Sequence, residues 1–263
     1  MSSDLVALLT ALGDSYGPTL QAALIVFLRV GAMMVLLPAF GEAVIPIRVR
    51  LGLGLAFTAI ITPALAPSLP PFPPTPLDLL RLVATETVAG FALGAGLRLF
   101  VIVLQVAGTI AAQATSLSQF FGGAGVDPQP AMSQILVMGG LALAVTLGLH
   151  VRLTELLLLS YQLFAPGYFL NPADLGDWGV AQVSRAFALA FTLAMPFVIL
   201  SLVFYVALGA INKAMPQLMV AFVGAPAITF AGLALLLLTA PLILPIWHEA
   251  FTGFIANPVG GAP

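Results

Sequence analysis

The chain has 263 residues, of which 61% are hydrophobic and only 7% are charged, and its formal net charge at pH 7 is −2. A water-soluble domain carries roughly 25% charged residues, so this chain has too few charges to cover a surface that faces water. The composition therefore excludes a soluble enzyme, a disordered chain and a nucleic-acid-binding protein, and it predicts an all-α protein that crosses a membrane several times.

Long apolar runs predict about six membrane-spanning helices. Crossing the hydrocarbon layer takes about 20 mostly apolar residues, and continuous apolar runs of that length favour helices. A weakly amphipathic stretch at 4–15 comes first, and six predicted spans follow it: 19–37, 49–65, 79–117, 132–159, 180–211 and 218–247. Because the third span is nearly twice the length needed, we expect it either to tilt out of the membrane or to break near Gly108.

A proline-rich segment separates the second span from the third. Seven prolines lie between Pro63 and Pro76. Proline lacks an amide donor and clashes with the preceding helical turn, so residues 63–76 are predicted to form a stiff, extended loop. Asp78 follows as the expected N-cap of the next helix.

The other connecting segments also carry helix-breaking or polar residues. The glycine-rich residues 116–131 form a second predicted loop, and residues 165–178 form a third. The chain is expected to end its first amphipathic stretch at Gly17 and Pro18, and to kink at Pro196 within the fifth span.

Residues able to carry out catalysis or bind a metal are scarce. His248-Glu249 begins like a metalloprotease helix, but Thr252 occupies the position that needs the second histidine. Without cysteine, the chain can form neither a disulfide nor a thiolate metal site. We therefore expect no catalytic residue, no cofactor and no bound metal.

Ionisable residues inside the predicted spans give a stronger signal. A charge at the bilayer centre costs about 2.5–3.5 kcal/mol or more, and Arg29, Glu86, Arg98 and Arg185 are the candidates. Glu86 and Arg98 lie twelve residues apart on one helix, about 18 Å along its axis, so they cannot pair with each other. We expect Arg29, Glu86, Arg98 and Arg48 to contact other helices or other subunits, whereas snorkelling to the membrane surface suits Arg185.

Glycine spacing on the third span gives a second packing signal. Gly90 and Gly94 form a small-xxx-small face that lets two helix backbones approach closely. The pattern fits packing within the chain as well as packing between subunits.

Three sequence blocks, read in order, resemble one known family. The first block is Arg29 with Pro38-Ala39-Phe40-Gly41 and Pro46-Ile47-Arg48-Val49-Arg50. The second is Glu86, Gly90 and Gly94, continuing through Gly108 and Gln113 to Asp127-Pro128. The third is Pro216-Gln217-Leu218 with Gly224-Ala225-Pro226. Their order and spacing are similar to those of the FliR family, the flagellar type III export-gate subunits, and their injectisome counterparts. The motif residues with an implied structural role are Pro38, Gly41, Pro46, Gln113, Asp127, Pro128, Pro216 and Gln217.

The resemblance implies a core subunit of a protein export gate and not an enzyme. It implies one domain over 1–263 that assembles with FliP-like and FliQ-like subunits into a helical hetero-oligomeric cone. An FlhB-like protein would lie at the cytoplasmic entrance, and unfolded secreted substrates would pass through the centre. The implied location is the bacterial inner membrane, at the flagellar basal body, with no nucleic-acid partner.

The loop at 116–131 resembles the segment that plugs the closed channel in this family. Phe120 and Phe121 could fill a narrow pore, and Gly122, Gly123 and Gly125 provide a pliable backbone. The alternative is an aromatic pair that anchors the loop at the lipid headgroups.

A six-helix small-solute permease is the alternative function, with Glu86 and Arg98 lining its path. Such a transporter would show a repeat between its halves, and the sequence shows no convincing one. The chemistry of the residues does not separate a flagellar from an injectisome role, although the resemblance favours the flagellar one.

Overall fold

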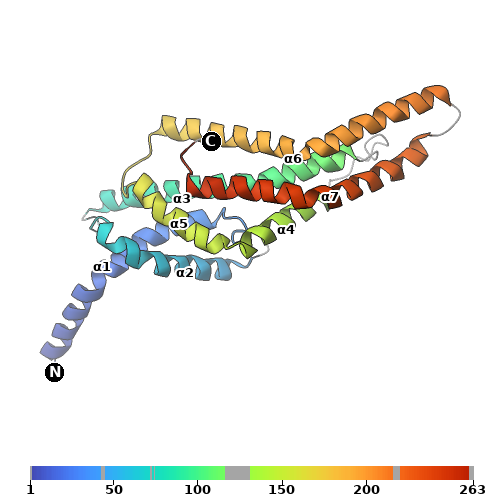
Figure 1. The fold of residues 1–263 in the computed structure, drawn as a ribbon. Helices are drawn as coiled ribbons and strands as arrows, with labels where there is room; N and C mark the ends of the chain where they lie inside the picture. Colours follow the sequence, from blue (N-terminus) through green and yellow to red (C-terminus); the bar gives the residue numbers. More distant parts are fainter. Residues whose placement is uncertain are drawn as a thin grey trace. The chain divides into compact units, whose positions relative to one another are not determined.

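The computed structural model describes residues 2–42, 45–71, 73, 75–115, 131–215 and 220–260. These residues form helices and no strand, which confirms the predicted all-α fold (Figure 1). The helices are α1 (Ser2–Met34), α2 (Ile47–Leu65), the 3-10 turn η1 (Ala66–Ser68), α3 (Pro76–Ala114), α4 (Ala131–Thr146), α5 (Leu149–Leu163), α6 (Pro172–Ala214) and α7 (Val220–Ala256).

The number of candidate membrane spans agrees with the prediction of about six. Five segments of the described chain are long and apolar enough to cross a membrane: Gly17–Met34, Ile47–Ser68, Pro76–Ala114, Pro172–Ala214 and Pro226–Ala256. The pair α4 and α5 provides a sixth if the two helices count as one span.

The prediction of one continuous helix at 132–159 is wrong. α4 ends at Thr146 and α5 begins at Leu149, so the two are separate helices. The break lies at Gly148, whose φ of +86° is left-handed and therefore incompatible with the α-helix. Glycine adopts this conformation without the steric penalty of a Cβ atom.

The expected end of the first helical stretch at Gly17 and Pro18 is absent, and of the two alternatives for the third span the break near Gly108 does not occur. α1 runs without interruption through Gly17 and Pro18, and α3 is continuous past Gly108. Proline removes one backbone hydrogen bond, but its fixed φ is close to the helical value. One proline can therefore lie inside a long apolar helix, as Pro196 does in α6, which changes direction near its middle (Figure 1).

The proline-rich connector is shorter than predicted. α2 includes Pro63, a 3-10 turn follows at Ala66–Ser68, and α3 begins at Pro76. The expectation that Asp78 is the N-cap is also wrong. Thr75 precedes the helix and is its N-cap, because its Oγ1 accepts a hydrogen bond from the amide of Asp78, the third helical residue, at 3.2 Å. The same hydroxyl donates to the Asp78 carboxylate at 2.6 Å.

The last two long helices extend beyond their predicted bounds. α6 begins at Pro172, where proline at the first helical position costs no hydrogen bond, and the Asn171 side chain caps it by accepting from the Ala173 amide at 3.1 Å. The loop predicted at 165–178 is therefore shorter. α7 continues past Trp247 to Ala256.

The chain divides into two compact units. The first unit contains Met1–Arg98, Gly148–Gly179 and Thr252–Pro263, and the second contains Leu99–Leu147 and Val180–Phe251. In the first unit α1 packs against α2, and α2 contacts α5. Its core side chains, such as Ile25, Val26 and Leu97, are almost fully buried.

The second unit is organised around Trp247. This side chain is fully buried, its Nε1 donates to the Phe100 carbonyl at 2.8 Å, and its ring stacks on Phe251 at a centroid distance of 5.2 Å. The parts of α6 and α7 in this unit lie side by side as a hairpin, with Gly224 against Leu208 (Figure 1).

Candidate functional site

A buried ion pair in the first unit joins α1 to α3. Arg29 is 1% exposed and Glu86 is fully buried. The Arg29 Nε donates to Glu86 Oε2 at 2.9 Å, and Nη2 donates to Oε1 at 3.2 Å. The guanidinium thus binds both carboxylate oxygens, the geometry in which an arginine–carboxylate pair is strongest.

Two groups at the end of α5 accept further hydrogen bonds from Arg29. Nη1 donates to Ser160 Oγ at 3.0 Å, and Nη2 donates to the Phe164 carbonyl at 2.9 Å. The guanidinium carbon also lies 3.7 Å from the centre of the Tyr161 ring, within the range of a cation–π interaction. One arginine therefore ties together α1, α3 and α5.

This cluster places two opposite charges in the core with no net charge. Removing a charge from water is costly unless it is paired and its remaining donors are bonded, and here the guanidinium nitrogens Nε, Nη1 and Nη2 all have acceptors. The geometry suits a structural link between helices. It offers no open cation and no reacting group.

A second ion pair holds the connector between α1 and α2. Arg98 on α3 donates to the Glu42 carboxylate at 2.5 Å, and both side chains are about one-third exposed. Arg50 on α2 donates to the backbone carbonyls of Glu42 and Ile45 at 3.2 and 3.1 Å. Arg48 is exposed, and no ion pair joins it to any residue that the structure describes.

The Pro38–Gly41 motif forms a tight turn at the end of α1. The Phe40 amide donates to the Pro38 carbonyl at 2.8 Å, and Ala39 between them has a φ of +64°. A Cβ at Gly41 would lie 2.7 Å from the Leu37 carbonyl oxygen, which explains glycine there. Phe40 packs edge-on against Phe57 of α2, so the turn fixes how α2 leaves α1.

The small-residue face of α3 is used within the chain. A Cβ at Gly90 would collide with the Arg29 carbonyl oxygen, and one at Gly94 would lie 2.9 Å from the Met33 carbonyl oxygen. The backbone of α1 therefore lies directly against these glycines. This contact places the Arg29 side chain beside Glu86, one turn before Gly90.

Two helix backbones also lie in close contact in the second unit, at Gly108 of α3. A Cβ there would collide with the backbone of Ser133 on α4, and Ser133 Oγ donates to the Gln105 carbonyl at 3.2 Å. α3 and α4 are thus in backbone contact on either side of the 116–131 segment. Gln113, near the end of α3, is exposed.

The remaining predicted residues fall into two groups. Pro38 is buried, and Pro46 lies at the N-cap of α2 with extended backbone angles. The other group lies outside the described residues: Phe120, Phe121, Gly122, Gly123, Gly125, Asp127, Pro128, Pro216 and Gln217.

Sequence reasoning missed the partners of the two arginines. Ser160, Tyr161 and the Phe164 carbonyl surround Arg29, and Glu42 pairs with Arg98. The polar run Ser160-Tyr161-Gln162 at the end of an apolar stretch was the available signal for the first cluster. Among the described residues, no group of three or more histidine, aspartate or glutamate side chains is placed to hold a metal.

Comparison with known proteins gives consistent matches along the chain. The family model for bacterial export proteins, family 1, matches residues 20–254. The flagellar biosynthetic protein FliR of Caulobacter vibrioides is 32% identical over 231 residues, covering 87% of this chain and 92% of that protein. The protein of the same name from Escherichia coli K12 is 30% identical over 233 residues, covering 86% of this chain and 86% of that protein. The one from Aquifex aeolicus is 27% identical over 253 residues, covering 88% of this chain and 90% of that protein.

Proposed function

The chain belongs to the bacterial export proteins of family 1, with the FliR proteins, and from this membership we propose that it is a core subunit of the flagellar type III export gate. In this role it forms, with FliP-like and FliQ-like subunits, the channel through which unfolded flagellar proteins cross the inner membrane at the basal body. An FlhB-like protein lies at the cytoplasmic entrance. The role is structural and transporting, without a catalytic step.

The extent of the match carries the proposal. Residues 20–254 include α2 to α6 in full, the second half of α1 and all but the last two residues of α7. The exposed apolar surface of the second unit supports it. In the most apolar windows of α6 and α7 only 28% and 22% of residues are buried within the chain, compared with 50% in α3. Such faces suit contact with lipid or with the apolar helices of neighbouring subunits.

Deleting the gene from a flagellated host tests the export role. Flagellar filament protein should then be made in the cytoplasm but be missing from the growth medium, and a plasmid copy of the chain should restore its secretion. Continued secretion by the deletion strain would contradict the proposal.

The loop at 116–131 is the channel plug in this proposal. Two adjacent aromatic rings, Phe120 and Phe121, exclude water from a narrow pore at rest, and the neighbouring glycines let the loop move aside for substrate. This assignment rests on the resemblance and the residue types.

Replacing Phe120 and Phe121 together with glycine should raise the leakage of small ions through the assembled complex, because the apolar constriction is lost. Ion conductance of membranes that contain the complex is the measurement. Phe169→Gly, which removes an exposed aromatic ring from a different loop, is the matched control and should leave conductance unchanged. If the double variant assembles correctly and its conductance equals that of the wild type, the loop at 116–131 is not the channel plug.

A further inference from the structure

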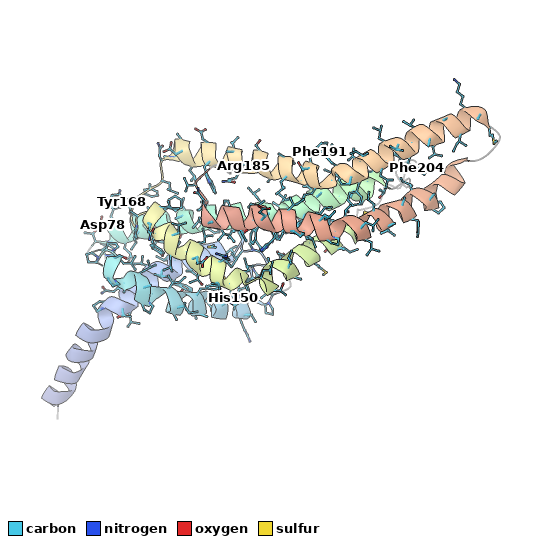
Figure 2. All side chains as sticks on the ribbon, viewed as in Figure 1. Asp78, His150, Tyr168, Arg185, Phe191 and Phe204 are labelled. Carbon is cyan, nitrogen blue, oxygen red and sulfur yellow. The ribbon has the colours of Figure 1, made fainter. Side chains whose placement is uncertain are left out.

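α2 buries one side of its helix and exposes the other. The buried side packs toward α1 and α5 and includes Phe57 and Ile61. Because an α-helix repeats every 3.6 residues, a second set of residues lies on the opposite side, and all of them are exposed (Figure 2). We call this set the α2 face: Arg48, Gly52, Leu55, Ala56, Ala59 and Ile60.

The middle of the α2 face is made of small residues, with larger apolar residues beside them. Gly52, Ala56 and Ala59 follow one another at helical spacing, and Leu55 and Ile60 next to them are 52% and 65% exposed. No described atom lies within 4 Å of a Cβ at Gly52, so packing inside the chain does not require glycine there. Glycine weakens a helix interior relative to alanine, and a contact outside the chain would account for its presence.

Gly90 of α3 shows what such a glycine does when a second helix covers it. The Arg29 carbonyl oxygen lies where a Cβ at Gly90 would be, so the backbones of α1 and α3 touch. Small residues let helix backbones approach closely in this way, whereas flexible lipid chains need no small residue to reach an apolar surface. The residue types of the α2 face therefore favour a helix as its partner.

Arg48 places a positive charge at the first turn of the α2 face. It lies one helical turn before Gly52, and no carboxylate of the described residues forms an ion pair with it. The preceding carboxylate, Glu42, is paired with Arg98, and residues 43–77 contain no Asp or Glu. A helix that covers this face would take the Arg48 guanidinium out of water, which is costly unless a carboxylate pairs with it.

We propose that the α2 face binds an apolar helix of a neighbouring subunit, and that this helix carries an aspartate or glutamate opposite Arg48. The small residues set a close approach of the two backbones, and Leu55 and Ile60 pack on either side of the partner helix. The ion pair between Arg48 and the partner carboxylate fixes the register of the two helices. This inference rests on the proposed function, because it requires a complex that contains other apolar subunits.

Reversing the charge of Arg48 tests the ion pair. Arg48→Glu should lower the amount of other subunits that co-purify with the tagged chain by about ten-fold or more, because like charges would then face each other across an interface. Suppressor mutations that restore secretion to this strain should replace an Asp or Glu in another subunit. Arg152→Glu is the matched control, since Arg152 is exposed and pairs with Glu155 of its own helix, and it should co-purify the wild-type amount. Wild-type co-purification by Arg48→Glu would overturn the proposal.

Gly52→Leu tests the close approach of the partner helix. The isolated chain should resist proteolysis on heating as well as the wild type does, because no described atom occupies the space at Gly52, but it should co-purify about ten-fold less of the other subunits. Gly176→Leu on α6 is the matched control: a Cβ there also meets no atom, and Asp174 and Asp177 lie beside it in the sequence. Full assembly of Gly52→Leu would contradict the close approach.

A photoreactive benzoylphenylalanine in place of Ile60 identifies the class of molecule that covers the α2 face. Irradiated in native membranes, it should form an adduct between the tagged chain and another protein subunit. Adducts with phospholipid alone, or no adduct, would overturn the proposal. A wild-type chain that purifies without any other subunit would instead contradict the proposed function, so the two failures are distinguishable.

Discussion

Arg29 shows why a charge can lie in the core of so apolar a chain. Its guanidinium binds a carboxylate, a hydroxyl and a backbone carbonyl from two other parts of the first unit, and it faces an aromatic ring. Removing one member of such a cluster leaves a buried group without its partner, whereas removing both charges leaves only a packing defect. The two kinds of variant should therefore behave differently.

Glu86→Gln should destabilise the chain by about 3–5 kcal/mol, because it leaves the Arg29 charge buried without a counter-charge. The double variant Arg29→Met with Glu86→Met should be more stable than Glu86→Gln alone. Resistance of the detergent-solubilised chain to proteolysis on heating is the measurement. Glu155→Gln, which breaks the exposed pair with Arg152, is the control and should change stability by less than about 0.5 kcal/mol. A double variant less stable than the single one would contradict this view of the cluster.

Gly90→Ala should also destabilise the first unit, because the added Cβ would collide with the backbone of α1 at Arg29. The neighbour is backbone and not the end of a flexible side chain, so α1 and α3 would have to separate. Gly52→Ala on α2 is the control: nothing lies within 4 Å of its Cβ, and the higher helix propensity of alanine should leave it as stable as the wild type or up to about 1 kcal/mol more stable. Thermal stability in detergent distinguishes the two, and equal effects would argue against the close approach of the helices.

At the scale of helices, the direction of the chain is set by single backbone positions. Ala39 turns the chain between α1 and α2 through a positive φ, and Gly148 does so between α4 and α5. By contrast, the prolines at 18, 63 and 196 lie within helices. A proline inside a helix therefore does not end it here, and the described residues with a positive φ all lie between helices.

Gly148→Ala should destabilise the chain by about 1 kcal/mol, because alanine is strained at a φ of +86°. No atom lies within 4 Å of the added Cβ, so the effect would report backbone strain alone. Gly176→Ala in α6 is matched, since its Cβ also meets no atom but its φ is not positive, and it should not lower the midpoint of thermal unfolding. If both variants unfold at the same temperature, residue 148 does not need the left-handed conformation that the structure shows.

At the scale of the whole molecule, composition and apolar runs were enough to predict the all-α fold and the number of spans, because a membrane restricts a chain to few solutions. Helix boundaries were predicted less well. The break at Gly148 lies in an uninterrupted apolar run, where one glycine is compatible with a helix or with a bend.

The polar cluster was predictable only in part. A charge in an apolar span needs a partner, and this requirement singled out Arg29, Glu86 and Arg98. Which groups pair depends on how α1, α3 and α5 pack, and the paired residues lie 57 and 56 positions apart in the sequence. The Phe164 carbonyl carries no residue-type signal at all, so no pattern of side chains could have identified it.

The proposed function requires that this chain works as one subunit of a larger membrane complex. The most direct test is to purify the tagged chain in mild detergent from its native cells and to measure the intact mass and subunit composition. We predict a stable complex with several copies of two other small hydrophobic proteins, the FliP-like and FliQ-like subunits. A lone monomer or homodimer, from cells shown to make those partners, would contradict the export-gate assignment.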